Sequence, residues 1–373
     1  MTSKWKIYRI KDVLSYVVDN RGKTPPIQDE GFELLEVNAI SATEKFPQYQ
    51  LVRKHVSEHV YNTWFRSGHL QIGDILVPTV GTLGAVSYVN KDNCCIAQNL
   101  IALRANKDIC DCDYLYYILR NPNTRKRLLN LNIGGVQPSI KVPHLMELEI
   151  TLPDIDTQRK NSNILKAIDD KISTNQKIND NLEQQAQAIY TAMFISNADP
   201  SWAQGKLSDL ITVKYGKDHK KLADGAYPVF GSGGIMRYVE QPLYSGESVL
   251  IPRKGTLNNV MYVNEPFWSV DTMFFTEMKI PNVAKFVFHF VKAKDLASMN
   301  AGSAVPSMTT DILNAMDLAI PSAERLAEFE SVVAPMYQAM QANNREAAKL
   351  AELRDTLLPR LMSGEIDVSD IQI

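Results

Sequence analysis

The sequence predicts an α+β protein built from two tandem copies of one plan, in which a mixed domain is followed by a long helix. Three observations lead to this prediction. A thirteen-residue block that begins at Pro78 returns at Pro252 with eight identical residues. A second block, beginning at Asn132, returns at Asn300, and each copy is followed by a long segment with apolar residues at helical spacing. Because the blocks recur in the same order, we interpret the chain as a tandem duplication.

The composition excludes several classes of protein. The chain has 373 residues, of which 45% are hydrophobic and 22% charged. That is an ordinary globular composition and not that of a disordered chain. No uninterrupted apolar run approaches the length of a membrane span, and the first residues lack a signal peptide, so we expect a cytoplasmic protein with no membrane partner. The formal net charge of −2 does not by itself indicate a polyanionic partner.

The mixed part of each copy contains short β-prone runs separated by turn residues. Residues 75–77 and 249–251 precede the repeated prolines and predict matching strands. Residues 114–131 predict a helix because leucine and isoleucine recur at helical spacing, and residues 284–291 take the equivalent place in the second copy. We expect both mixed parts to be compact α+β domains.

The second part of each copy predicts one long helix. Apolar residues alternate at steps of three and four through both segments, with Arg354 as a polar exception. The 168-residue offset between the copies is a multiple of seven, so the heptad phase is preserved. A period of 3.5 residues is typical of coiled-coil packing. We expect Pro335 to kink the second helix or delay its regular part, because proline lacks an amide donor.

Asn175 and Asn343 are equivalent and lie near the middles of the two predicted helices. A buried asparagine in a coiled coil costs stability but can fix its register. If the helices pack antiparallel, the two side chains should meet near a pseudo-twofold axis. The alternative is that both simply point towards solvent.

Short motifs occupy residues 225–234, 257–260, 300–307, 320–321 and 357–366, with 72–77 and 152–153 in the first half. Single motifs are weak, but their order and duplication are specific. Through them the whole chain resembles the specificity subunit of type I restriction–modification systems. This resemblance implies two tandem α/β target-recognition domains separated by two long helices, which pack as an antiparallel intramolecular coiled coil with pseudo-twofold symmetry. The segments it implies are recognition domains at 1–153 and 197–321, and spacer helices at 154–196 and 322–373, the last with the C-terminal tail.

The resemblance also implies a function. Each recognition domain would read one half of a bipartite double-stranded DNA target, while the helices set the spacing and dock two adenine methyltransferase subunits. Motor-nuclease subunits would complete the restricting complex. One alternative is a specificity subunit that serves a fused restriction–methylation enzyme. Two others are a stand-alone DNA enzyme and a coiled-coil scaffold without DNA contact.

Catalytic chemistry is not expected of this chain. The glycine-rich run at 230–234 lacks the spacing of a dinucleotide-binding loop, and we interpret it as a turn or DNA-facing loop. The six histidines form no metal-ligand pattern. The cysteines are spaced C-C and C-x-C, unlike common zinc sites, which favours ordinary reduced thiols over a metal site. We therefore expect no catalytic residue, cofactor or metal; the four cysteines are Cys94, Cys95, Cys110 and Cys112.

Candidate DNA-contacting side chains lie in the basic loops of both domains. Lysine and arginine suit phosphates, whereas glutamine, serine and arginine reach base edges in the major groove. Each single residue could instead belong to a solvated turn, and the near-neutral net charge predicts weak DNA binding by the isolated chain. The candidates in the first domain are Arg21, Lys23, Thr82, Gln137, Ser139 and Lys141. Those in the second are Lys214, Lys217, His219, Lys220, Lys221, Arg253, Lys254, Thr256, Ser303 and Ser307.

Overall fold

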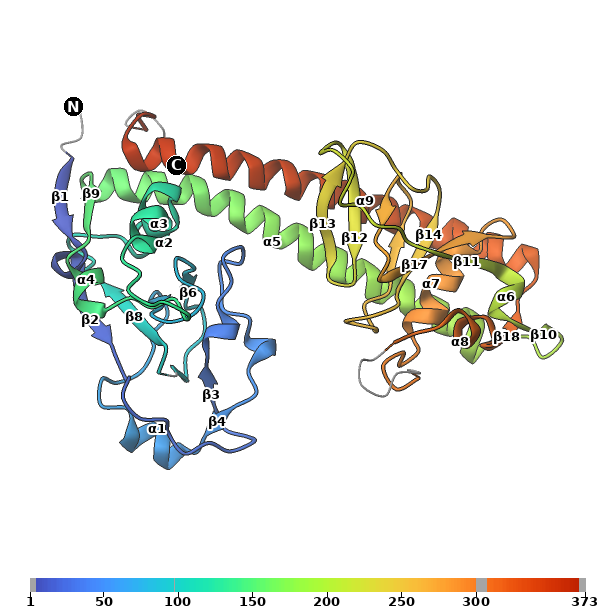
Figure 1. Ribbon diagram of the computed structural model, residues 1–373, viewed down its shortest axis with the longest axis horizontal. Helices are drawn as coiled ribbons and strands as arrows, with labels where there is room; N and C mark the ends of the chain where they lie inside the picture. The colour runs from blue at the N-terminus through green and yellow to red at the C-terminus, as the bar shows by residue number, and fades with distance from the viewer. Residues whose placement is uncertain (1–4, 97, 300–306, 369–373) are drawn as a thin grey trace. The chain divides into compact units, whose positions relative to one another are not determined.

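The computed structural model describes residues 5–96, 98–299 and 307–368. It divides into two compact units. Unit 1 comprises Met1–Asn175 and Asn344–Ile373, and unit 2 comprises Gln176–Asn343. Each unit therefore contains one mixed domain together with a segment of each long helix (Figure 1).

Unit 1 contains two small sheets and one two-stranded pair. Its four-stranded sheet is antiparallel throughout, in the order β2-β8-β5-β6. In its three-stranded sheet, ordered β4-β3-β7, the central strand is antiparallel to β4 and parallel to β7. The antiparallel pair is β1-β9. These strands are β1 (Lys6–Arg9), β2 (Leu14–Val18), β3 (Phe32–Leu35), β4 (His55–Val56), β5 (Ile75–Pro78), β6 (Ser87–Tyr88), β7 (Cys94–Ile96), β8 (Leu100–Ala105) and β9 (Glu149–Leu152).

The single helix expected over residues 114–131 is two helices. The chain breaks between them at Asn121, whose side chain accepts a hydrogen bond from the Asn123 amide at 2.9 Å. Pro122 favours this break because it has no amide donor to continue a helix but fits the first helical turn. The helices of unit 1 are α1 (Glu58–Trp64), α2 (Cys112–Arg120), α3 (Pro122–Leu129) and α4 (Val142–Met146), with 3-10 turns at Ile10–Val13, Val37–Ala39 and Tyr49–Leu51.

Unit 2 repeats the sheet topology of unit 1 strand for strand. Its sheets have the orders β11-β17-β14-β15, β13-β12-β16 and β10-β18. The central strand β12 is again antiparallel to one neighbour and parallel to the other. The strands are β10 (Ala203–Lys206), β11 (Ile211–Tyr215), β12 (Tyr227–Gly231), β13 (Gly234–Val239), β14 (Ser248–Pro252), β15 (Met261–Val263), β16 (Trp268–Ser269), β17 (Met273–Met278) and β18 (Asp317–Ile320). The strands predicted before the repeated prolines are thus confirmed as β5 and β14.

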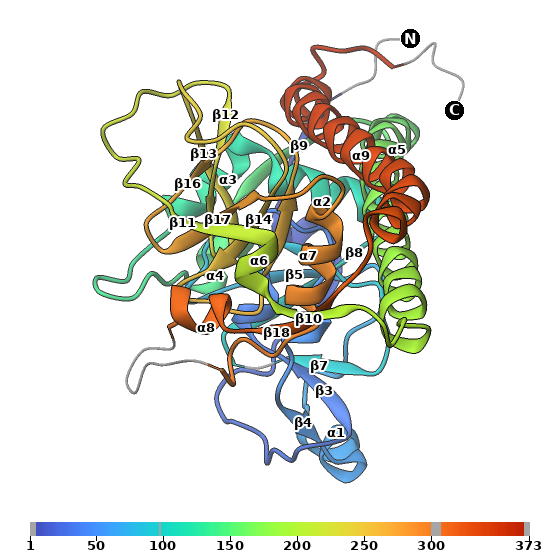
Figure 2. The same cartoon turned by 90° about the vertical axis from the view of Figure 1, so that its right-hand side faces the viewer.

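The main helix of each domain is buried in its core along most of its length. In unit 2 that helix is α7 (Ala284–Lys292), which lies beside β14 (Figure 2) and also contacts β15. In unit 1 it is α2, whose tyrosines and leucines pack beneath the four-stranded sheet. Unit 2 has two further short helices, α6 (Leu207–Leu210) and α8 (Thr310–Asn314). In the part of unit 2 that the structure describes, no helix corresponds to α1.

The two long helices are α5 (Ile155–Thr191), which ends in a π-helical turn at Ala192–Ser196, and α9 (Ala323–Ser363). The helix is not delayed at Pro335, because α9 begins at Ala323 and continues through the proline. A kink at Pro335 stays a prediction. Phe329 and Val333, just before it, are fully buried in the core of unit 2. Tertiary packing of this kind, rather than local propensity, supplies most of a helix's stability. Among the described residues, every helix is too short or too polar to cross a bilayer.

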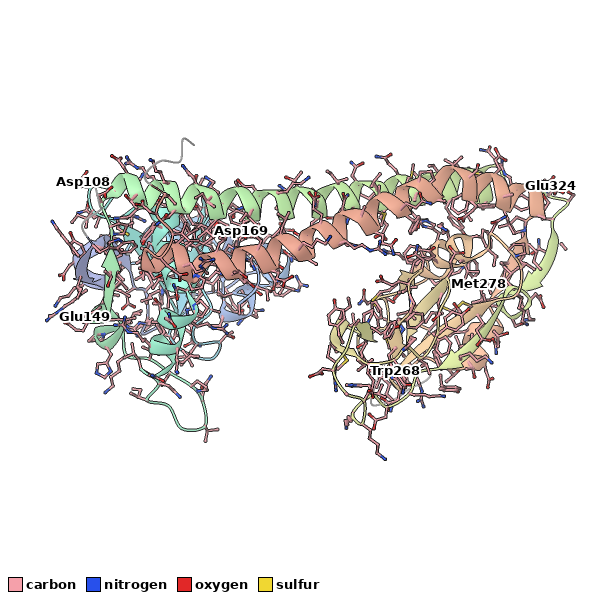
Figure 3. All side chains as sticks on the ribbon, turned by 90° about the horizontal axis from the view of Figure 1, so that it is seen from above. Asp108, Glu149, Asp169, Trp268, Met278 and Glu324 are labelled. Carbon is pink, nitrogen blue, oxygen red and sulfur yellow. The ribbon has the colours of Figure 1, made fainter. Side chains whose placement is uncertain are left out.

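The long helices contact each other within each unit. In unit 1 the Asn161 side chain donates to the carbonyl of Leu361 at 3.1 Å, and Asp169 on α5 faces α9 (Figure 3). In unit 2 the Asn343 side chain donates to that of Asn179 at 2.8 Å. In unit 2 Tyr190 also contacts Phe329. As the residue number rises along α5, that of its partner on α9 falls in both units, so the contacting segments are antiparallel.

Both seam asparagines have partners in their own unit. Asn175 donates to Glu346 at 2.8 Å in unit 1, and Asn343 donates to Asn179 in unit 2. Asn175 is buried, so the interpretation that it points towards solvent is wrong. A contact between Asn175 and Asn343 would join the two units and stays a prediction.

Candidate nucleic-acid interface

The two repeated sequence blocks meet in space in both units. In unit 1 Val80 forms an isolated β-bridge with Ser139, and the Gly81 amide donates to the Pro138 carbonyl at 2.9 Å. In unit 2 the equivalent bridge joins Lys254 and Ser307. The duplication therefore preserves a contact between two loops that are far apart in the sequence. We call this pair of loops the paired loops of each unit: residues 78–83 with 132–141, and 252–259 with 307–308.

A glycine shapes the first loop of each pair. Gly81 has a φ of 88° and Gly255 a φ of 84°, a region that residues with side chains rarely adopt. At Gly255 an added Cβ would also lie 2.6 Å from the Ser232 hydroxyl, in the turn between β12 and β13. The glycine is followed by an exposed threonine in both units, Thr82 and Thr256, so the turn presents a hydroxyl beside the bridge.

The second loop of unit 1 is closed by a side chain. Asn132 accepts hydrogen bonds from the amides of Gly134, at 3.0 Å, and Ser139, at 2.9 Å. The loop consequently projects Gln137 into solvent, while Lys141 lies exposed just before α4. Thr82, Gln137 and Ser139 are thus brought together as candidate contacts.

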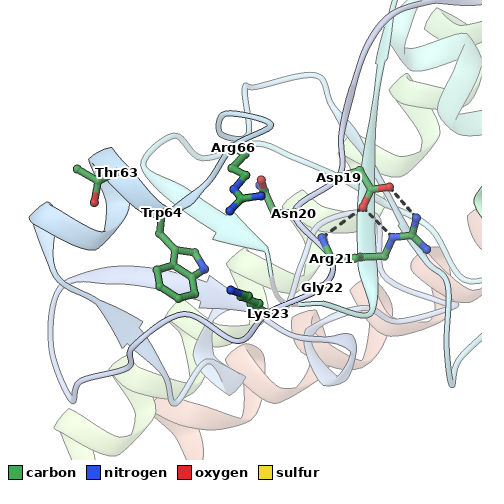
Figure 4. Close-up of a pocket in the computed structure, with 8 residues that line it drawn as sticks. All are labelled: Asp19, Asn20, Arg21, Gly22, Lys23, Thr63, Trp64 and Arg66. Carbon is green, nitrogen blue, oxygen red and sulfur yellow. Dashed lines mark hydrogen bonds and ion pairs between the residues drawn. The ribbon is translucent and has the colours of Figure 1, made fainter.

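Arg21 and Lys23 lie in a separate exposed turn after β2. Arg21 donates two hydrogen bonds to Asp19, both at 2.7 Å, and these bonds lower the pKa of the Asp19 carboxyl. With Lys23, Trp64 and Arg66, this turn lines a hollow of about 390 Å³ (Figure 4). Trp64 and Arg66 come from α1 and the turn after it, and neither was predicted from the sequence as a DNA contact.

In unit 2 the paired loops carry a cation held over an aromatic ring. The guanidinium of Arg253 lies 5.4 Å from the ring centroid of Tyr215, the last residue of β11. Tyr215 is 52% exposed. The Arg253 backbone is fixed on both sides, since its amide donates to Thr272 and its carbonyl accepts from Met308. Arginine stacked on an aromatic ring is pre-organised to donate in a fixed direction.

The basic run after β11 is not uniform. Lys214 lies within β11 and forms an ion pair with Glu277 at 3.4 Å, so its charge is compensated inside the domain. Lys217, Lys220 and Lys221 are exposed in the turn beyond it, whereas His219 is half-buried. Ser303 lies outside the described residues. Lys254, Thr256 and Ser307 belong to the paired loops.

The aromatic residues beside these basic loops, Tyr215 and Trp64, were not predicted from the sequence. Tyr215 stands inside the selected run of lysines, and Trp64 lies two residues before an arginine. Both residues could therefore have been predicted as DNA contacts from the alternation of aromatic and basic residues in the sequence.

The cysteines do not form a reactive site in this structure. Cys94, Cys95 and Cys110 are buried and Cys112 is half-buried. Burial raises the pKa of the Cys94 and Cys95 thiols to about 12, so both are protonated at neutral pH. Within the residues that the structure describes, no cluster of histidine, cysteine or acidic side chains could hold a metal ion.

Two domains of one topology, each with an exposed pair of repeated loops and each followed by a long helix, define a duplicated recognition protein. The chain belongs to the type I restriction modification DNA specificity domain family, whose model matches residues 2–184 and 200–329. The resemblance inferred from the sequence to a type I specificity subunit is confirmed.

Relatives and solved structures agree with this assignment. The chain is 22% identical over 308 residues to the type I restriction enzyme MjaIX specificity subunit of Methanocaldococcus jannaschii, covering 71% of each chain. It is 21% identical to the HindI specificity subunit of Haemophilus influenzae, covering 79% of this chain and 86% of that one. The crystal structure of a type I restriction–modification S subunit from M. genitalium matches with a TM-score of 0.59 at 18% identity, over 96% of both chains. That likeness shows a shared fold.

Proposed function

We propose that the chain is the DNA-recognition subunit of a type I restriction–modification complex, and that residues 1–153 and 197–321 each read one half of a bipartite duplex target. The observation that carries this proposal is the meeting of the two repeated blocks in both units. In each unit the bridge places hydroxyl and basic or amide side chains at the surface, the groups that bind phosphates and base edges.

The two domains should read different half-sites, because the same scaffold presents different side chains. Unit 2 has Arg253 over Tyr215, whereas the residue equivalent to Arg253 in unit 1 is the buried Thr79. Unit 1 has α1, with Trp64 at its end. One topology with unlike loops suits an asymmetric bipartite sequence.

We further propose that the spacer helices, α5 within residues 154–196 and α9 within residues 322–373, form an antiparallel coiled coil, with the domains related by a pseudo-twofold axis. The opposite direction of the contacting helix segments within each unit supports this arrangement. Such a coiled coil would set the spacing between half-sites and dock two adenine methyltransferase subunits. Those subunits, with motor-nuclease subunits, would catalyse methylation and cleavage, and this chain would recognise the DNA target.

Adenine-methylation mapping tests the function. A host that expresses this chain with its methyltransferase partner should acquire one bipartite methylated motif, and deletion of the chain should abolish that methylation. Methylation that persists unchanged after the deletion would refute the proposal. The purified chain alone should transfer no methyl group to DNA; transfer by the chain alone would identify a stand-alone enzyme instead.

A further inference from the structure

The hollow in unit 1 is built from two segments that are far apart in the sequence. The turn after β2 contributes Asp19 to Lys23, and the end of α1 with the following turn contributes Thr63, Trp64 and Arg66. At about 390 Å³ it is within the ~300–1,000 Å³ range of small-molecule pockets. Figure 4 shows Trp64, Lys23 and Arg66 around one space, with Thr63 away from it and Arg21 turned to Asp19.

Side-chain hydrogen bonds hold the two segments together. Asn20 accepts from the Ser67 amide at 2.9 Å and donates to the Gly68 carbonyl at 3.0 Å. The Ser67 hydroxyl donates to the Asp19 carbonyl at 2.8 Å. These three bonds hold the segment that carries Arg66 beside the turn that carries Lys23, so the fold brings the two cations to the same hollow.

The charges of the hollow are unbalanced. Among the described residues, the one carboxylate in its lining is Asp19, and Arg21 engages both of its oxygens at 2.7 Å. Lys23 and Arg66 are exposed and face no carboxylate in that lining. Holding like charges together without a counter-charge is unfavourable, and a bound anion relieves it.

An exposed indole completes the hollow. Trp64 is the last residue of α1, a helix whose start is fixed by a hydrogen bond from the Val60 amide to the Ser57 side chain at 3.2 Å. Its side chain is 36% exposed. An aromatic face beside two cations suits a ligand that has both an anionic group and an apolar face.

We infer that this hollow is a binding site for one sugar–phosphate unit of duplex DNA, with Lys23 and Arg66 on the phosphate and Trp64 against the deoxyribose. The inference rests on the proposed function. The turn also adjoins the paired loops of unit 1: Gln98 donates to Thr24 at 2.5 Å, and the neighbouring Asn99 carbonyl accepts from the Thr79 amide at 2.8 Å. The described part of unit 2 has no counterpart of α1, so this contact anchors the first half-site.

The test measures DNA affinity against salt concentration for the chain assembled with its methyltransferase partners on a target duplex. Each phosphate contact contributes about 1 to the slope of log affinity against log salt. Lys23→Gln and Arg66→Gln should each lower that slope by about 1, and Arg66→Lys should restore it. Trp64→Ala should weaken binding about tenfold with the slope unchanged, as expected for lost stacking or packing. The matched control, Lys107→Gln, removes an exposed charge of unit 1 outside the hollow and should leave both quantities unchanged.

Fluorescence distinguishes DNA from a free nucleotide as the ligand. The contribution of Trp64 is the part of the tryptophan emission that Trp64→Phe removes. Target duplex should quench this part in the unmodified complex. Deoxynucleotide monophosphate or inorganic phosphate, added in place of the duplex, should leave it unchanged. Quenching of Trp64 by the monophosphate alone would make the hollow a nucleotide site and overturn the inference. Unchanged salt slopes in the Lys23 and Arg66 variants, with bipartite methylation intact, would overturn it while the proposed function stands. Failure of the unmodified complex to bind any target would count against the proposed function, and with it against this contact.

Discussion

Arg354 on α9 donates to a carboxylate oxygen of Asp169 on α5 at 2.9 Å, and Tyr117 on α2 donates to the other oxygen at 2.7 Å. Both charged side chains are largely buried, with exposures of 13% and 8%. Within unit 1 this carboxylate therefore ties the two long helices to the main helix of the domain. It also explains why an arginine interrupts the apolar pattern of α9.

Replacing Arg354 should leave the buried carboxylate of Asp169 without a cationic partner. Arg354→Met leaves Asp169 with Tyr117 alone and should lower the free energy of unfolding by about 3–5 kcal/mol, the usual cost of breaking a buried ion pair. Thermal denaturation measures the change. Arg360→Met removes an arginine from the exposed Arg360–Glu365 pair on the same helix and should cost less than about 1 kcal/mol. Equal effects of the two variants would show that the Asp169 contact contributes no special stability.

Unit 2 should lose stability in mild acid through His289. Burial lowers the pKa of this imidazole to about 4, and its two nitrogens lie 2.8 Å from Gln187 and 2.9 Å from the Tyr337 hydroxyl. The unfolded chain takes up the proton near pH 6.5, before the folded chain does, so the contribution is complete above that pH and is lost as the pH falls towards 4.

The loss at about pH 5 should be about 2 kcal/mol from this residue. Urea unfolding at neutral pH and at about pH 5 measures it as the difference between the unmodified chain and His289→Gln, which keeps hydrogen-bonding groups but does not titrate. The idea fails if both proteins show the same pH dependence.

The two equivalent glycines should differ in their tolerance of alanine. Gly81→Ala meets only the strain of a positive φ, about 1 kcal/mol, because the nearest atom to an added Cβ is a Val37 methyl carbon at 3.5 Å. Gly255→Ala meets the same strain and also the Ser232 hydroxyl. Denaturant unfolding should show the larger destabilisation for Gly255→Ala. A larger loss at Gly81 would contradict the described turn geometry.

The Arg253–Tyr215 pair should contribute to recognition of the second half-site. Arg253→Ala should weaken binding of a target duplex by about tenfold, and Tyr215→Ala should weaken it less, because it removes the ring that orients the guanidinium but keeps the charge. Competition binding with duplexes that are altered in one half-site at a time shows which half-site the substitution affects. Lys214→Gln is the control, since Glu277 already compensates that lysine. An effect confined to the first half-site would exclude this role.

The proposed meeting of Asn175 and Asn343 can be tested by cross-linking. The double variant Asn175→Cys/Asn343→Cys should form an intramolecular disulfide under mild oxidation, visible as faster migration without reductant. Each single variant is a control for the native cysteines, of which Cys94, Cys95 and Cys110 are buried. Absence of the cross-link in a folded double variant would place the two side chains apart.

Much of the fold was accessible from the sequence because the duplication acts as an internal comparison. The strands before Pro78 and Pro252, the main helix of unit 2 and the two long helices were all predicted from repeats and periodicity. The missed features depend on local competition that a pattern does not resolve. The Asn121–Pro122 step divided a predicted helix, whereas core packing around Phe329 and Val333 carried α9 through Pro335.

The sequence by itself determined the two-copy plan, the order of domains and helices, and the family. Those properties depend only on the identity of the residues and on their spacing along the chain. Tertiary structure alone decided which side chains share a surface: Val80 with Ser139, Arg253 with Tyr215, and Lys23 with Trp64 and Arg66. Such neighbours are brought together by strand register and by side-chain hydrogen bonds between distant segments, and no local pattern in the sequence encodes that proximity.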